Sequence, residues 1–73
     1  MSAEAFAMQI TVNGQPRQTR EATTLSELLG ELGLADKPVA VEVNLQLVPR
    51  QRHAQHTLAA GDKLEIVTLV GGG

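Results

Sequence analysis

The sequence predicts a small α+β roll, in which one helix covers one face of a mixed sheet of four to five strands. Two observations carry this prediction. Segments near both ends of the chain alternate apolar and polar residues, the period of a half-buried strand, and one segment between them carries leucines at helical spacing. A hairpin, one crossing helix and further strands make up the plan of such a roll. The 73 residues allow one domain at most.

The first element is a predicted hairpin. Residues 8–12 alternate apolar and polar side chains, and Asn13-Gly14 follows at once. Asn-Gly is the strongest short hairpin signal because both residues tolerate the positive φ of a type I′ turn. The return strand, residues 15–20, is polar, and Pro16 withholds one amide from the ladder. This suits a strand at a sheet edge or a proline near the start of a strand.

The helix is predicted over residues 24–32. Thr24 and Glu27 have the spacing of a capping box, in which each side chain bonds the other residue's amide. Leucines at positions 25, 28, 29 and 32 then form one apolar stripe. Gly33 stands where a C′ glycine would end the helix. A helix this short needs a sheet to pack against.

Three further strands are predicted after the helix. Residues 39–43 place three valines on one face, Asn44 supplies a turn, and Pro49 ends a short strand over residues 45–48. A polar, irregular stretch with a helical turn is expected until the turn at residues 60–62, followed by a last strand over 63–69. If the first and last strands are neighbours, they are parallel and central.

Composition excludes several classes of function. The chain has no cysteine, which removes disulfides, thiolate metal sites and cysteine nucleophiles. A net charge of −2, no basic run and Phe6 as the single aromatic residue argue against a nucleic-acid partner. No apolar stretch is long enough to span a bilayer, and the first residues do not resemble a signal peptide. We expect a cytoplasmic protein without a membrane partner.

The chain divides into a flexible N-terminal extension (residues 1–7), a domain (8–70) and a flexible glycine tail (71–73). Glycine has no Cβ, so Gly71-Gly72-Gly73 can thread a narrow channel and present a terminal carboxylate to another protein. No other group looks reactive. His53 and His56 lack the further ligands that a metal site needs, so we expect no metal.

Several motifs together resemble the ThiS family, the sulfur carriers of thiamin (thiazole) biosynthesis, which have the ubiquitin-like β-grasp fold. The resemblance covers residues 8–73, and no single piece of it is specific. The pieces that carry it are residues 8–14 (MQITVNG), 24–29 (TLSELL), 41–44 (VEVN), 48–50 (VPR), 60–62 (AGD) and 65–73 (EIVTLVGGG).

The resemblance implies a protein substrate and carrier rather than an enzyme. In this family an E1-like adenylyltransferase of the ThiF type uses ATP and Mg²⁺ to adenylate the C-terminal glycine, here Gly73. The carboxylate becomes a thiocarboxylate with sulfur from a desulfurase system, and thiazole synthase of the ThiG type receives that sulfur. No cofactor is expected to stay bound. The partner-binding residues would be Leu69, Val70, Gly71, Gly72 and, outside the tail, Arg50.

Three alternatives remain open at this point. A sulfur carrier of another pathway, such as the small subunit of molybdopterin synthase, would use the same chemistry. Those subunits are somewhat longer and have a proline-containing segment before their glycines, which this chain lacks. A ubiquitin-like modifier conjugated to lysines would use the same tail. A plain interaction domain would give the tail no role, and Arg50 would be a solvated loop charge.

Overall fold

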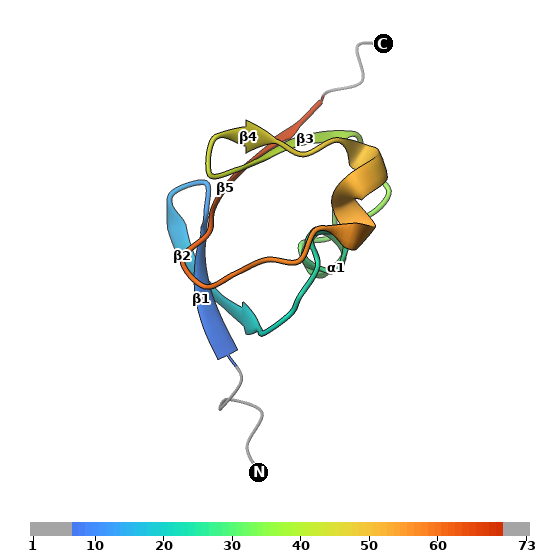
Figure 1. Ribbon diagram of the computed structural model, residues 1–73. Coiled ribbons are helices and arrows are strands. Elements are labelled where there is room, and N and C mark those ends of the chain that lie inside the picture. Colours follow the sequence, from blue (N-terminus) through green and yellow to red (C-terminus); the bar gives the residue numbers. More distant parts are fainter. Residues whose placement is uncertain (1–6, 70–73) are drawn as a thin grey trace.

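The computed structural model describes residues 7–69 and shows one mixed sheet with a helix across it (Figure 1). The elements in chain order are β1 (Ala7–Val12), β2 (Gln15–Arg20), α1 (Leu25–Glu31), β3 (Val39–Val43), β4 (Gln46–Leu47), the 3-10 helix η2 (Arg50–Gln55) and β5 (Lys63–Thr68). The predicted fold class, a β-grasp roll, is confirmed.

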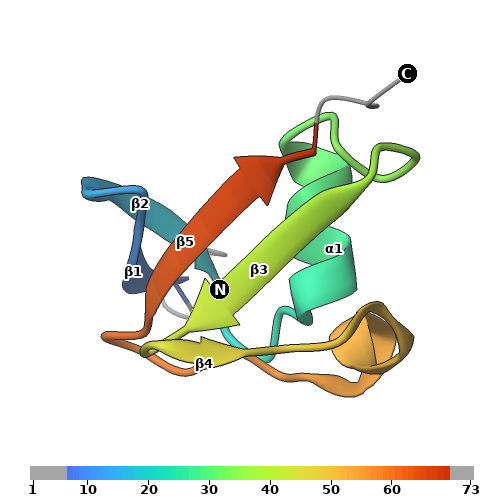
Figure 2. The same ribbon diagram turned by 90° about the horizontal axis from the view of Figure 1, so that it is seen from above.

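The sheet has five strands in the order β2-β1-β5-β3-β4. β1 and β5 are parallel neighbours, and every other pair is antiparallel, as the sequence predicted for the first and last strands. β2, with Pro16, lies at an edge. Figure 2 shows β3 and β5 in front of α1, so one face of these strands packs on the helix and the other is left open.

The helix has the two ends that the sequence predicts. Thr24 and Glu27 form the capping box through bonds of 2.9 and 3.1 Å. At the other end Gly33, with φ of +76°, donates to the Gly30 carbonyl, and Leu34 donates to the Leu29 carbonyl. These two bonds are the Schellman motif, which turns the chain sharply toward β3.

The core lies between the leucine stripe of α1 and the inward residues of the strands. Leu28 is fully buried and Leu29 is 5% exposed, as predicted. The buried hydrophobic residues are Met8, Ile10, Leu25, Leu28, Leu29, Val41, Val43, Val48, Leu58, Leu64 and Ile66. Within residues 7–69 the core contains no aromatic side chain, so its stability there depends on close packing of flexible and branched side chains.

The structure corrects several predicted boundaries. β1 begins at Ala7, which pairs with Arg20, so the strand starts one residue earlier than expected. The strand expected over 45–48 shortens to Gln46–Leu47, because Leu45 joins Asn44 in the turn with positive φ. β5 ends at Thr68 rather than at position 69. The rest of the expected extension, residues 1–6, and the expected tail, residues 71–73, lie outside the described residues.

Candidate functional site

The end of β5 is the last described point before the glycine tail, and it is held on both sides. On one side β5 pairs with β3 from Leu64 to Thr68, and the Leu69 amide continues the ladder by donating to the Pro38 carbonyl at 2.9 Å. The end of β5 therefore lies in the interior of the sheet, with β3 beside it.

On the other side β1 stops early, and Asn13 takes over its role. β1 pairs with β5 only at Thr11–Lys63 and Val12–Leu64. Beyond them, the Asn13 side chain accepts from the Ile66 amide at 2.8 Å and donates to the Ile66 carbonyl at 3.1 Å. The amide group thus makes both hydrogen bonds that a neighbouring strand would make. The sequence identified Asn13 only as a turn residue.

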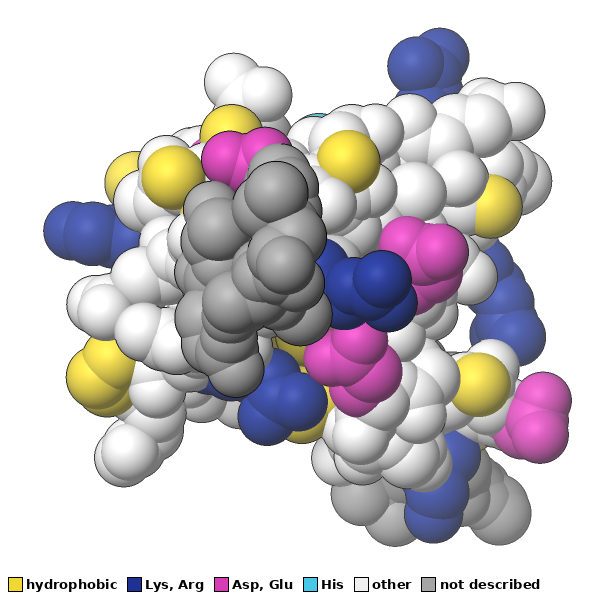
Figure 3. All heavy atoms as spheres, turned by 90° about the horizontal axis from the view of Figure 1, so that it is seen from below, with side chains coloured by type: hydrophobic (Ala, Val, Ile, Leu, Met, Phe, Trp, Pro, Cys, Tyr) yellow, Lys and Arg dark blue, Asp and Glu magenta, His cyan; other side chains and the backbone are white. Residues whose placement is uncertain are grey.

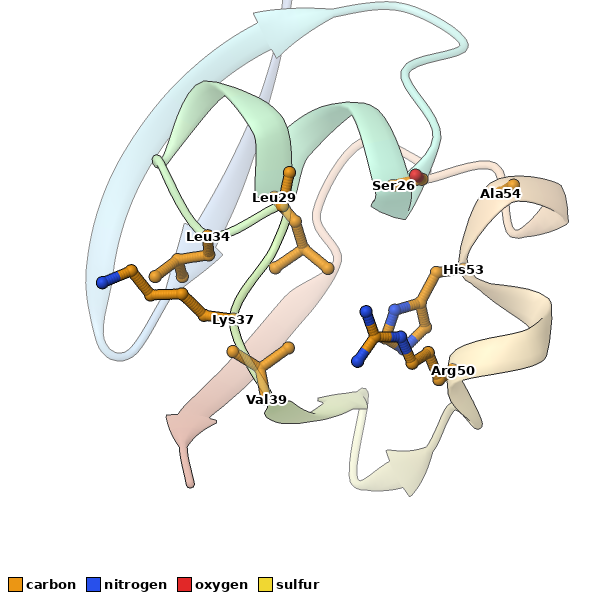
Figure 4. A pocket seen from close by; sticks show the side chains of 9 residues that line it. Ser26, Leu29, Leu34, Lys37, Val39, Arg50, His53 and Ala54 are labelled. Carbon is orange, nitrogen blue, oxygen red and sulfur yellow. The ribbon is translucent and has the colours of Figure 1, made fainter. Parts of the chain in front are cut away.

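Arg50 lies in a pocket close to this strand end. The pocket has a volume of about 170 Å³ between α1, the loop before β3 and η2, with Leu29, Leu34 and Val39 among its lining residues (Figure 4). Arg50 brings a guanidinium group to it, whereas Lys37 lines it with an ammonium group that points away from Arg50 (Figure 4). Val39 pairs with Thr68, so the pocket adjoins the part of β5 from which the tail departs. The pocket thus connects η2, which carries Arg50, with Val39, the strand partner of Thr68.

His53 is buried and hydrogen-bonded within the domain. It is 7% exposed, and its Nε2 lies 3.0 Å from the Val48 carbonyl oxygen, which identifies Nε2 as the protonated donor. Among residues 7–69 no group of three or more potential metal ligands comes together. Of the other predicted site residues, Val70, Gly71, Gly72 and Gly73 lie outside the part of the chain that the structure describes.

The open face of β3, β4 and β5 carries a feature that sequence reasoning missed. Glu42 pairs with Glu65 on one side and with Leu47 on the other, so these three side chains share the face away from the helix. Val67 lies farther along the same face of β5, and Leu69 follows in the same alternation. We call Glu42, Glu65, Leu47, Val67 and Leu69 the outer patch.

The outer patch holds three of the four large hydrophobic side chains that are most exposed among residues 7–69, with Leu45 in the adjoining turn as the fourth. By contrast, the face in Figure 3 has scattered hydrophobic groups and mixed acidic and basic side chains. Scattered apolar residues need no explanation, whereas a group on one face marks an interaction site. The composition of the chain does not reveal this patch, because the register of the strands decides which residues share a face.

No helix within residues 7–69 has the length and apolar character needed to cross a membrane.

The chain matches the model of the ThiS family over residues 10–73. It is 36% identical over 66 residues to the sulfur carrier protein ThiS of Escherichia coli, covering 90% of this chain and all of that one. A crystal structure of the thiamine biosynthesis protein ThiS from Geobacter metallireducens superposes with a TM-score of 0.77 at 35% identity, covering 90% of this chain and 100% of that chain.

A longer relative is also similar. The thiazole synthase of Paramagnetospirillum magneticum is 47% identical over 66 residues, which are 90% of this chain but 20% of that protein. The chain therefore spans about a fifth of the length of this relative.

Proposed function

Because the chain belongs to the ThiS family, we propose that it is a sulfur carrier for thiazole formation in thiamin biosynthesis, with Gly73 as the residue that carries sulfur. The observation that carries this proposal is a family match that runs through the strand β5 and the three glycines to position 73. Full coverage of the Escherichia coli sulfur carrier supports it.

The proposed chemistry takes place on the Gly73 carboxylate. A carboxylate oxygen attacks the α-phosphorus of ATP, pyrophosphate leaves, and an acyl-adenylate forms. A sulfur nucleophile at the sulfide level, supplied by a desulfurase system, then attacks the carbonyl carbon, and AMP leaves as the C–S bond of the thiocarboxylate forms. Mg²⁺ and hydrogen-bond donors of the ThiF-type partner stabilise the charge that develops on the phosphates. Because this step consumes ATP, we place it in the cytoplasm.

The chain's own part in this chemistry is delivery. β5 is fixed by β3 on one side and by Asn13 on the other, so the strand that precedes the tail has a defined position. Gly71 and Gly72 add reach without side chains, which lets the carbonyl approach the nucleotide closely. Leu69, Val70 and Arg50 would contact the partner, Arg50 from the pocket between α1 and η2.

Thiazole synthase of the ThiG type is the proposed acceptor of the sulfur. A protein that is named thiazole synthase includes a segment 47% identical to this chain, which supports a close working relation between the two activities. The carrier would meet two enzymes in turn, and the same tail would enter both active sites.

Adenylation by the cognate ThiF-type enzyme tests the proposal, with ATP–pyrophosphate exchange as the readout. We expect exchange with the intact chain and none after deletion of Gly73, because the carboxylate would then sit one residue, ~3.5 Å, short of the nucleotide. Gly72→Leu should also abolish exchange by blocking the approach. Gly30→Leu is the matched control, since an added Cβ at this exposed helix position meets no atom within 4 Å.

Intact mass spectrometry distinguishes the alternatives. After incubation with ATP, the adenylating enzyme and a sulfur donor, a carrier gains the mass difference between one sulfur and one oxygen atom. A ubiquitin-like modifier would instead give high-mass conjugates. Sulfur or adenylate on a side chain, or full exchange by the chain that lacks Gly73, would refute the proposal.

A further inference from the structure

Two carboxylates face each other at the centre of the outer patch. Glu42 on β3 and Glu65 on β5 are direct partners in the antiparallel register. Like charges in directly opposite positions of a sheet destabilise it. The only ion pair among residues 7–69 joins Arg17 and Glu31, so within that part of the chain neither carboxylate has a cationic partner. Lys63 is the cation closest in sequence on this face of β5, two residues before Glu65.

Apolar side chains flank this acidic pair: Leu47 is the strand partner of Glu42, and Val67 follows two residues after Glu65 on the same face. Leu47 is 66% exposed, Val67 57% and Leu69 50%, although all three could have been polar without loss to the core. The electrostatic interactions of charged groups beside apolar surface become stronger when a partner excludes the water around them. The outer patch therefore combines two features that the isolated fold does not need and that a bound partner would use together.

We propose that Glu42 and Glu65 jointly receive one guanidinium group of the adenylating partner, while apolar side chains of that partner cover Leu47, Val67 and Leu69. This inference rests on the proposed function and specifies the chemistry of its docking surface. A guanidinium carries five N–H donors in a planar fork, so it can bond two carboxylates on adjacent strands at once. It is also less strongly hydrated than an ammonium group, which favours arginine over lysine in a covered site.

The location of the pair explains why such an anchor would help adenylation. Glu65 lies four residues before Leu69 on the strand that leads into the tail, a distance of about 13 Å along β5. A partner arginine held by Glu42 and Glu65 would fix the root of the tail relative to the partner's nucleotide site. The acidic pair would thereby increase affinity for the carrier without touching the reacting carboxylate.

Single charge removals test this inference. Glu42→Gln and Glu65→Gln each keep the side-chain shape and remove one negative charge. We expect KM for the carrier in ATP–pyrophosphate exchange to rise at least about fivefold, with kcat within about twofold of the intact chain. Glu21→Gln is the matched control, because it removes the same charge from an exposed turn away from the patch and should leave KM unchanged.

Stability of the free carrier provides the second readout. Because each substitution relieves the repulsion between Glu42 and Glu65, the urea midpoint should rise in both variants and stay constant in Glu21→Gln. Added salt should raise KM of the intact chain more steeply than KM of Glu65→Gln.

The outcomes separate the two proposals. If the intact chain supports exchange and both variants keep its KM, the inference is overturned while the proposed function stands. A lower urea midpoint in the variants would show that the carboxylates support the fold, which also overturns the inference. If the intact chain supports no exchange at all, the proposed function fails and the docking inference fails with it.

Discussion

The two faces of β3 and β5 differ in composition, although alternating residues of the same two strands form them. Toward the helix, Val41 is fully buried and Leu64 is 1% exposed, and the inward positions are apolar up to Thr68 at the end of β5. Away from the helix, the same strands place Glu42 opposite Glu65 and leave Val67 exposed. The inner face agrees with the requirements of a stable sheet, and the outer face contradicts them.

This difference assigns inward residues of a strand to folding and outward residues of the same strand to binding. Natural sequences agree with their fold at most positions, and the exceptions concentrate where a function requires them. Adjacent residues of β5 therefore have different tasks: Leu64 and Ile66 hold the domain together, and Glu65 and Val67 are available to a partner. Substitutions on the two faces should separate stability from activity.

Removal of a leucine from each face gives the largest expected contrast. Leu28→Ala should lower the free energy of unfolding by ~2–5 kcal/mol, because Leu28 is fully buried against the sheet and leaves a cavity. Leu47→Ala should change it by less than ~0.5 kcal/mol, since Leu47 is 66% exposed. Urea unfolding monitored by circular dichroism measures both.

The exchange assay should give the reverse order. At a temperature where both variants are folded, Leu47→Ala should raise KM for the carrier and Leu28→Ala should not. Equal losses of stability in the two variants would contradict the division between the faces.

A smaller contrast is expected between two asparagines that each bond to β5. Asn13 bonds both backbone groups of the buried Ile66, whereas Asn44 donates to the half-buried Asp62 carboxylate and accepts from the Lys63 amide. Both have positive φ, so replacement by glycine keeps the backbone and removes only the side chain.

Asn13→Gly should therefore lower stability by ~1–3 kcal/mol, because the Ile66 groups lose their partners. Asn44→Gly should lower it by less than ~1 kcal/mol, since water replaces the lost bonds. Hydrogen exchange of the Ile66 amide is the direct measurement, and unchanged protection in Asn13→Gly would show that Asn13 does not support the end of β5.

The fold was predictable from the sequence wherever local signals and burial agreed. The leucine stripe, the capping box at Thr24 and Glu27, and Asn13-Gly14 each fix a local conformation that the sheet then uses. The boundary at Leu45 was wrong because a leucine gives no sign of positive φ, and the register of the hairpin decides its conformation.

The candidate site was predictable only in its chemistry. The resemblance predicted roles for the three C-terminal glycines, Leu69 and Arg50, and these roles remain predictions. It did not identify Glu42, Glu65 or Lys37, because their proximity to other groups arises from pairing between strands and loops far apart in the chain. His53 was considered for a metal site, and its burial against the Val48 carbonyl became visible only in three dimensions.

The two hairpin turns provide the smallest and most specific test of the comparison. Both are two-residue turns with positive φ at each position: Asn13-Gly14 joins β1 to β2, and Asn44-Leu45 joins β3 to β4. Leu45 has φ of +70° and is 84% exposed, so the steric strain of its backbone conformation is not offset by burial of its side chain. Leu45→Gly should stabilise the domain by ~1 kcal/mol, because glycine avoids the steric penalty of this conformation. Leu45→Ala is the control: it removes the side chain but keeps the penalty, so its stability should match that of the intact chain.

If Leu45 belongs to the docking surface beside the outer patch, Leu45→Gly and Leu45→Ala should raise KM for the carrier equally, although only Leu45→Gly is more stable than the intact chain. Equal stability of the two variants would show that the leucine bears no such cost, and unchanged KM in both would limit the docking surface to the strands.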